Sequence, residues 1–356
     1  CIQRTQIVVT GNLNVTGVLD DNGKLPAIVG GGSNRLFYVG SGGKLIIETL
    51  TLTEGNVAEN NCYNYIQWYN HNKAFGGAIY VTDGEFIGIK VKIMGNKACS
   101  GGGLFSVRGT IQLNNTFIGE NTARVAGGGL FVRWGSVKMI GGTKAHNYVL
   151  DTRADDANEF GGGGGFFWQI PSAAFFNTSI VNNTAQRGSG LYLADDGGIA
   201  LDNVLIEKNG LTMNGTVSKA GGGVRVKCSI NKQCNLTILS SMLRFNVVSA
   251  STRSNYGGGG LHLSRNAYVV VRESQFIRNV APQGRASQIR SEANGETPKI
   301  SLINVNFVNV GNVPPFTGSC GGDYCGTQTC ASNPCTVFPF TGRCTNRTGN
   351  LGVLCD

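Results

Sequence analysis

Three aspartates are the residues best suited to acid–base chemistry in this sequence. Asp83, Asp195 and Asp196 each follow a short apolar strand that begins with Gly-Gly or Ser-Gly. Carboxylates held side by side can act as acid and base in glycoside hydrolysis. The corresponding turns after neighbouring strands carry other residue types: Arg108, Trp134-Gly135 and Pro171. No acidic ladder is therefore expected, and we predict that the chain is not an enzyme.

The other polar clusters also favour structural explanations. His262 alternates with apolar residues in a strand, which is typical of a packed or outward-facing side chain. Five charged residues of the loop 148–160 could bind a metal, but a solvated loop is the favoured interpretation: Asp151, Arg153, Asp155, Asp156 and Glu159. We expect no bound metal and no cofactor.

Composition restricts the class of protein and its partners. The chain has 356 residues with 54 Gly, 14% charged residues and a net charge of +9. That charge is compatible with an acidic polysaccharide or an anionic surface. The basic residues are scattered, so no nucleic-acid module is expected. The most apolar stretch, 160–176, contains five consecutive glycines and Pro171, which excludes a membrane-spanning helix there.

Eleven cysteines indicate an oxidising compartment, because crowded cysteines without nearby histidines are typical of disulfides. Cys228 and Cys234 flank a five-residue turn, and we expect them to pair. Six more cysteines admit fifteen pairings: Cys320, Cys325, Cys330, Cys335, Cys344 and Cys355. Cys1, Cys62 and Cys99 complete an odd total, so one cysteine is free or joined to another chain. Cys1 is the candidate for an interchain bond, and truncation of a longer protein explains the odd number equally well.

Seven Asn-x-Ser/Thr sequons also favour secretion, although an asparagine-rich chain produces some by chance: Asn14, Asn114, Asn177, Asn182, Asn214, Asn235 and Asn346. Together with the cysteines they predict a secreted, N-glycosylated protein of a eukaryotic route. The chain begins at Cys1, and we interpret it as a mature form or a fragment.

Two elements repeat along the chain. In the first, a Gly-Gly pair or a close variant precedes an apolar strand, whose first apolar residues are Ile79, Leu104, Leu130, Phe166, Leu191, Val224 and Leu261. In the second, an apolar residue and two variable residues precede an asparagine: Asn96, Asn121, Asn183, Asn209, Asn246 and Asn279. A base period of about 25 residues with several short strands is typical of one coil of a parallel β-solenoid.

The predicted fold is therefore all-β: a right-handed, single-stranded parallel β-helix of about ten coils over residues 1–313. Inward residues such as Ile79, Leu104, Leu130, Phe166 and Leu191 are expected to form one column. The repeated asparagine is expected at a corner, in a left-handed conformation, with its amide bound to a neighbouring coil. Residues 314–356, after Pro314-Pro315, are predicted to form a disulfide-rich C-terminal cap.

The paired Gly-Gly-Ala-Ile and Phe-x-x-Asn elements resemble the repeat of the bacterial polymorphic outer-membrane proteins, over roughly residues 35–310. The resemblance implies the pectin-lyase-like right-handed β-helix superfamily, which includes adhesins, polysaccharide-cleaving enzymes and structural fibre proteins. The Gly-His-Gly and Arg-Ile-Lys signatures of the pectin-hydrolysing members are absent. The cysteine-rich C-terminus and the sequons differ from the bacterial pattern, so a eukaryotic extracellular relative fits better.

Long insertions follow the repeated asparagine and are expected along one edge of the solenoid, a common position for a binding face. The loop 59–74 carries a candidate interface beside Cys62: Tyr63, Tyr65, Trp68 and Tyr69. These rings could equally cover the side of the solenoid. We predict a structural glycoprotein that assembles with itself or related chains into an extracellular filament or appendage, such as a flagellar hair (mastigoneme). An adhesin that binds a glycan or surface is the alternative, and a carbohydrate-active enzyme ranks third.

Overall fold

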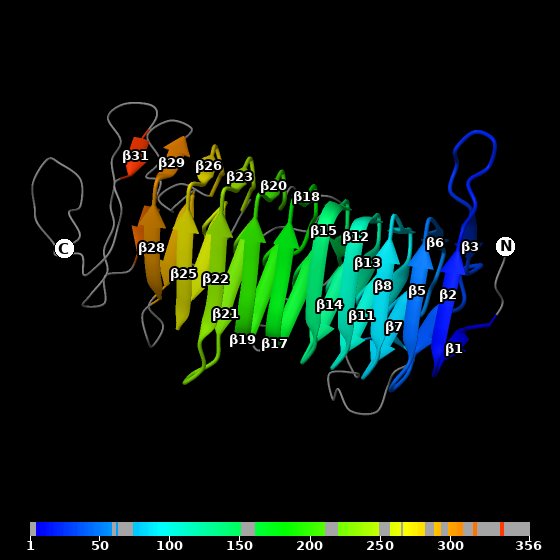
Figure 1. Cartoon of the computed structure of the whole chain (residues 1–356). Coiled ribbons are helices and arrows are strands. Elements are labelled where there is room, and N and C mark those ends of the chain that lie inside the picture. Colours follow the sequence, from blue (N-terminus) through cyan, green and yellow to red (C-terminus); the bar gives the residue numbers. More distant parts are fainter. Residues whose placement is uncertain are drawn as a thin grey trace, which may run out of the picture.

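The described chain is all-β, with strands and no α-helix. The computed structural model describes residues 5–58, 62, 74–150, 161–210, 220–248, 257–264, 266–281, 288–292 and 298–308, and two strands at 316–318 and 335–337. Within these ranges, no helix could cross a lipid bilayer. Figure 1 shows the strands side by side along an elongated molecule, from β1 (Ile7–Val9) to β28 (Lys299–Ile303).

Each strand pairs in parallel with a strand one repeat later. Strand β7 (Ile79–Thr82) pairs with β11 (Leu104–Val107), and β11 pairs with β14 (Leu130–Arg133). Between β7 and β11 the chain passes through β8 (Glu85–Ile89) and β9 (Lys92–Met94), which belong to other parts of the sheet. The large parallel sheet predicted from the repeat is thus present.

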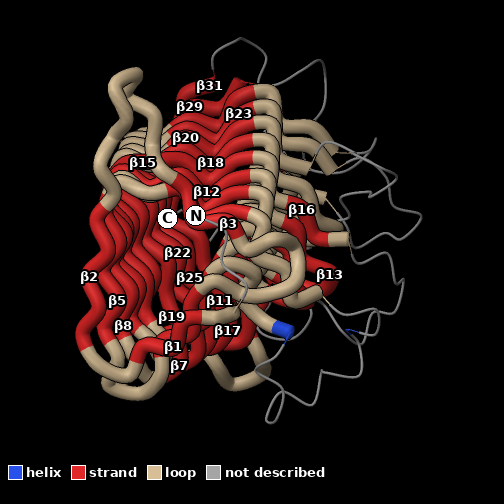
Figure 2. Tube along the Cα trace, turned by 90° about the vertical axis from the view of Figure 1, so that its right-hand side faces the viewer, coloured by secondary structure: helices blue, strands red, loops and turns tan. Residues whose placement is uncertain are grey.

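Three stacks of parallel strands surround a common interior (Figure 2). The first stack contains β1, β4 (Phe37–Val39), β7, β11, β14, β17 (Gly165–Phe176), β19 (Leu191–Asp202), β21 (Val224–Cys228), β24 (Leu261–Ser264), β27 (Ile289–Glu292) and β30 (Phe316–Gly318). The second stack contains β2 (Asn12–Thr16), β5 (Lys44–Glu48), β8, β12 (Thr110–Gly119), β15 (Ser136–Ala145), the second halves of β17 and β19, β22 (Cys234–Leu239), β25 (Ala267–Arg272) and β28.

The third stack contains β3 (Ala27–Val29), β6 (Thr51–Thr53), β9, the ends of β12 and β15, β18 (Ser179–Val181), β20 (Leu205–Glu207), β23 (Met242–Arg244), β26 (Gln275–Ile277) and β29 (Val305–Val308). A smaller parallel sheet follows it, made of β10 (Lys97–Ser100), β13 (Thr122–Ala126) and β16 (Tyr148–Val149). One set of strands, with one member in each stack, is called a layer below.

Apolar columns fill the interior. In the column predicted from Ile79 to Leu191, the member assigned to Phe166 is shifted by one residue. Leu130 pairs with Gly165, and Gly165 pairs with Leu191, so Phe166 does not belong to this column. The five glycines at 161–165 offer several Gly-Gly pairs, and Gly163-Gly164 is the pair that packs against the preceding layer. A shift of one residue in a strand moves a side chain to the opposite face of the sheet.

Phe166 instead belongs to an aromatic column on the outer side of the first stack. Ring centroids of successive members are 4.6–5.5 Å apart in the order Tyr38, Tyr80, Phe105, Phe131, Phe166 and Tyr192. Five of the six are buried, and the column packs beside Phe75 and the smaller sheet. Aromatic pairs at such distances contribute about 0.5–1.5 kcal/mol each beyond burial.

A ladder of buried asparagine side chains runs along the corner between the third stack and the smaller sheet. Each Nδ2 before the last donates to the Oδ1 of the next asparagine, at 2.8–3.0 Å, and to a backbone carbonyl one layer back, at 2.8–3.1 Å. Each Oδ1 after the first also accepts from the preceding asparagine's backbone N–H, at 3.0–3.3 Å. At the two ends, the Asn279 Nδ2 donates to Gln288 Oε1 and the Asn96 Oδ1 accepts from the Gly55 N–H. The ladder comprises Asn96, Asn121, Asn147, Asn183, Asn209, Asn246 and Asn279.

The predicted bonding of this asparagine to the neighbouring layer is therefore confirmed, but its predicted left-handed conformation is wrong. The residue immediately before each ladder asparagine has the positive φ: Gly95, Glu120, His146, Asn182, Lys208, Phe245 and Arg278. That residue makes the bend, which leaves the asparagine free to direct its backbone N–H along the ladder.

Glycines before the first-stack strands have two separate functions. Gly127 has φ of +63°, a left-handed conformation that glycine adopts without a steric penalty. At Gly102 a Cβ would lie 2.4 Å from the carbonyl oxygen of Gly128 in the next layer. The layers can therefore approach closely here only if the side chain is absent.

Two strands of the segment predicted to be a cap adjoin the last layers. Strand β30 continues the first stack in parallel beside β27. Strand β31 (Cys335–Val337) pairs antiparallel with β29, and it therefore covers the last edge of the third stack. The disulfide connectivity of the segment lies outside the described residues.

Replacing one ladder asparagine should destabilise the whole stack. Asn121→Ala removes two donated hydrogen bonds and leaves the Asn96 N–H and amide without their acceptor, so we expect a loss of about 2–5 kcal/mol. Urea unfolding monitored by circular dichroism measures the effect. Thr110→Ala, at an exposed position of the same layer, is the control. Equal midpoints for the two variants would contradict a structural role for the ladder.

Candidate functional site

The aspartates considered for acid–base chemistry occupy the turns after the first stack and are separated from one another. Asp83 and Asp195 lie four layers apart along this stack. Arg108, one layer after Asp83, donates to both of its oxygens, at 2.6 and 2.8 Å. This hydrogen bonding lowers the pKa of Asp83 below its ordinary value, so Asp83 stays ionised near neutral pH and is poorly suited to donate a proton.

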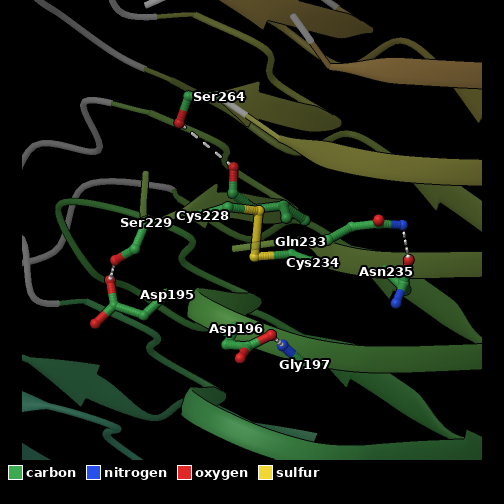
Figure 3. Close-up of a disulfide and its surroundings, with 10 residues drawn as sticks. Asp195, Asp196, Gly197, Cys228, Ser229, Gln233, Cys234, Asn235 and Ser264 are labelled. Carbon is green, nitrogen blue, oxygen red and sulfur yellow. Dashed lines mark hydrogen bonds between the residues drawn. A yellow bond between two sulfur atoms is a disulfide. The ribbon is translucent and has the colours of Figure 1, made fainter. Parts of the chain in front are cut away.

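Asp195 belongs to a cluster of two tryptophans and an arginine. The Trp168 indole N–H donates to its Oδ2. The Ser229 hydroxyl donates to its Oδ1 at 2.7 Å (Figure 3). The buried guanidinium of Arg133 lies between two rings, 3.7 Å from the Trp134 centroid and 4.1 Å from the Trp168 centroid. Cation–π contacts and hydrogen bonds to both carboxylate oxygens make this a structural cluster that joins four layers.

In the layer of Trp168, the turn after the first stack lies two residues earlier in the sequence than the repeats predict. Gln169, with φ of +52°, occupies the turn that was assigned to Pro171, and its Oε1 accepts from Trp134 Nε1 at 2.8 Å. Asp196 lies 3.5 Å from the Lys232 amine. Gln169 has no carboxylate, and the Asp196 carboxylate contacts Lys232 and the Gly197 N–H, whereas that of Asp195 contacts Trp168 and Ser229.

His262 is fully buried in the first stack, between Arg225 and Arg290 of the adjacent layers. The packed position expected for it is therefore observed. Within the described ranges, no group of three or more His, Cys, Asp or Glu side chains could hold a metal ion. The charged residues of the loop 148–160 that were considered for this purpose, Asp151 to Glu159, lie outside the described residues.

Two disulfides lie within the described chain. Cys228 ends β21 and Cys234 begins β22, and the predicted disulfide between them closes the turn that joins the first and second stacks (Figure 3). A second disulfide links Cys62 to Cys99 of β10. Sequence analysis left these two cysteines unassigned because neither has a partner nearby in sequence. Cys1 lies outside the described residues.

Three sequons share one face of the molecule. Asn14, Asn114 and Asn235 are exposed on the outer side of the second stack, in β2, β12 and β22. Asn177 is exposed in the turn between the second and third stacks, and Asn182 is half-buried at the corner before Asn183. Asn214 and Asn346 lie outside the described residues.

The long insertions leave from one row of the molecule, as the repeat spacing predicts. Residues next to the insertions are aligned in this row by parallel bridges: Asn56 with Lys97, Thr122 with Tyr148, Tyr148 with Thr184, and Val247 with Val280. A groove of about 590 Å³ lies along the same row, lined in part by Lys97, Arg124, Tyr148 and Thr184. The candidate interface residues Tyr63, Tyr65, Trp68 and Tyr69 lie outside the described residues.

Strand edges are available at both ends of the stacks. Within the described chain, β1, β2 and β3 pair on one side only, with β4, β5 and β6. At the other end β28 pairs only with β25. Apolar side chains near the first edge are exposed, including Val8 at 57% and Val18 at 84%.

Sequence analysis missed Lys144, a fully buried lysine in the core. It occupies the column between Ile118 and Ile180, in the apolar position three residues before a ladder asparagine. Its Nζ lies 4.0 Å from the Phe175 ring centroid and has no hydrogen-bond partner among the described residues. Burial lowers the pKa of Lys144 from 10.5 to about 7. The motif Lys-Ala-His-Asn at 144–147, with lysine where the repeat has an apolar residue, was the signal available in the sequence.

No family model matches the chain, and neither the curated proteins nor the solved structures contain a match. The candidate surfaces must therefore be interpreted from their own chemistry.

Removing the buried amine should stabilise the protein. The folded chain binds fewer protons at Lys144 than the unfolded chain between pH 7 and 10.5, so wild-type stability should rise with pH in this window. We expect Lys144→Met to raise the unfolding free energy at pH 7 by roughly 2–4 kcal/mol and to flatten that rise. Denaturant unfolding at pH 7 and pH 9.5 measures both effects. Lys138→Met, on the exposed face of the same strand, is the control, and the idea fails if Lys144→Met is the less stable variant.

Proposed function

We propose that this protein is a secreted structural glycoprotein that joins end to end with copies of itself or related chains in an extracellular filament or surface appendage. In this proposal the parallel stacks are a right-handed β-helix of the pectin-lyase-like type, with repeats similar to those of the polymorphic outer-membrane proteins. The segment 314–356 forms a disulfide-rich cap, and Cys1 can join neighbouring chains.

The unpaired strand edges at the ends of the stacks are the observation that carries the proposal. A parallel strand with one free edge presents N–H and C=O groups that another chain can pair with. Strands β1, β2 and β3 present three such edges side by side, in the same register as every later layer. The β28 edge of a second molecule, which β30 and β31 leave uncovered, could pair there with β2 and continue the hydrogen bonding of the second stack.

Apolar exposure at the same end supports an interface. Ile7, Val8, Val18 and Leu19 are 38%, 57%, 84% and 47% exposed. Burial of such side chains contributes about 25 cal/mol per Å² of apolar surface. The two disulfides and the exposed sequons favour the oxidising secretory route that the proposal requires.

A charge at the open edge should prevent assembly. We expect wild-type protein from a eukaryotic secretory host to form end-to-end polymers by electron microscopy, and Val8→Lys to remain single molecules, because a lysine at a strand edge disfavours pairing. Ile140→Lys introduces the same change at a 40% exposed position midway along the second stack and should still polymerise. Wild-type protein that stays monodisperse at high concentration would reject the proposal, as would polymers of Val8→Lys equal to wild type.

A second function, binding of an acidic polysaccharide, is favoured by the groove beside the insertion row. Lys97 and Arg124 line this groove together with Tyr148, which combines positive charge with an aromatic surface. Clefts that carry one sign of charge attract ligands of the opposite sign. This arrangement corresponds to the adhesin-like alternative.

Charge reversal in the groove tests this second function. We expect polygalacturonate to bind wild type and to bind Lys97→Glu about tenfold more weakly, since the loss of one close charge contact is of the order of 1.4 kcal/mol. Binding measured by calorimetry should also weaken as salt rises. Lys138→Glu makes the same change in net charge outside the groove. Equal weakening by the two variants would mean that overall charge alone attracts the polysaccharide.

A further inference from the structure

A second groove, of about 520 Å³, runs along the turn between the second and third stacks. It extends over four successive layers and is lined by residues of the turns at 177–179, 203–205, 240–242 and 273–275. At about 4.8 Å per layer, its length from Asn177 to Glu273 is about 14 Å. We call it the turn groove.

The turn groove combines an apolar floor with a polar rim that also carries the charged residues Arg244 and Glu273. Leu205 and Met242 are half-buried on the outer side of the third stack and contribute the apolar surface. Asn203, Ser240 and Gln275 are exposed and can donate or accept hydrogen bonds. A sugar ring has the complementary character, with C–H groups on its face and hydroxyls at its edge.

Buried hydroxyls of the same turns donate their protons to backbone carbonyls and so hold the shape of the groove. Thr178 Oγ1 donates to the Phe176 carbonyl at 3.0 Å, and Ser241 Oγ donates to the Leu239 carbonyl at 2.6 Å. Both residues are at most 4% exposed. The groups left for a ligand are therefore those on the rim and the floor.

Asn177 lies at one end of this groove and begins the sequon Asn177-Thr178-Ser179. Its φ is +50°, and its side chain is exposed at the turn. Asn203 Nδ2 donates to Asn177 Oδ1 at 2.8 Å, which orients the amide and uses its oxygen. The Nδ2 atom, where an N-linked sugar is attached, is left for that bond.

We propose that Asn177 carries an N-linked glycan whose first sugars lie in the turn groove, over Leu205 and Met242. The inference rests on the secretory route of the proposed function. In the attachment step, Asn177 Nδ2 forms a bond to C1 of the first N-acetylhexosamine of a lipid-linked oligosaccharide pyrophosphate. The C1–O bond to the pyrophosphate breaks, the lipid pyrophosphate leaves, and the amide loses one proton.

The other described sequons differ from Asn177 in their surroundings. Asn14, Asn114 and Asn235 stand on the strands of the second stack, and Asn182 lies half-buried at the corner before Asn183. None of the four lines the turn groove. A glycan at Asn235 should therefore extend into solvent, whereas one at Asn177 contacts protein. Asn235 is for this reason the internal reference.

The experiment uses the full chain secreted from a eukaryotic host, with glycan occupancy of each sequon measured by peptide mass spectrometry. Ser179→Ala removes the sequon of Asn177 and keeps the asparagine. Ser179→Thr changes the same residue but keeps the sequon. Thr237→Ala removes the reference sequon of Asn235. We expect the melting temperature to fall by about 2–4 °C in Ser179→Ala only, because this variant loses the contacts between the first sugars and the floor of the turn groove. Enzymatic release of the folded protein's glycans should be at least tenfold slower at Asn177 than at Asn235.

Occupancy at Asn235 without occupancy at Asn177, or equal release rates at the two sites, would overturn the inference alone. Equal melting temperatures for Ser179→Ala and Ser179→Thr would also overturn it. Occupied and protected Asn177 in a protein that forms no polymer would support the glycan and reject the filament. A secreted chain without any glycan would reject both.

Discussion

Parallel pairing in register is the constraint on which the rest of this structure depends. Each residue lies over an equivalent residue of the next layer, so a side chain is compatible with the fold only if it also fits its two neighbours in the column. The asparagine ladder satisfies this condition by donating and accepting at every layer, which leaves no buried amide unpaired along its length. The glycines before the first stack satisfy it by leaving room for the carbonyl of the next layer.

The sequence predicted those parts of the structure that repeat with the layer. The Gly-Gly strands and the apolar-x-x-Asn element predicted the parallel sheet and the asparagine ladder. The short turn between Cys228 and Cys234 predicted their pairing. The register failed at 161–165 because five identical residues contain no information on which pair begins the strand. The left-handed position was assigned one residue too late because several residue types adopt it in this chain, from glycine to phenylalanine. Lys144 could be recognised only by comparing its segment with the repeat, in which an apolar residue occupies the same position.

The outer surfaces were less predictable, because nothing repeats there with the same strictness. The aromatic column, the Arg133 sandwich between two tryptophans and the turn groove each depend on which residues neighbouring layers happen to place together. The pairing of Cys62 with Cys99 depends on an insertion whose path the period does not describe. The irregular features therefore lie on the outer surfaces, and the regular interior holds them in place.

The direction of the backbone hydrogen bonds has a mechanical consequence. In all three stacks the bonds between strands run along the length of the molecule, from one layer to the next (Figure 1). A pulling force between the two ends would therefore load the interlayer contacts in series, and the weakest contact would set the tensile strength. Stretching would therefore separate one pair of layers while the neighbouring pairs stayed intact.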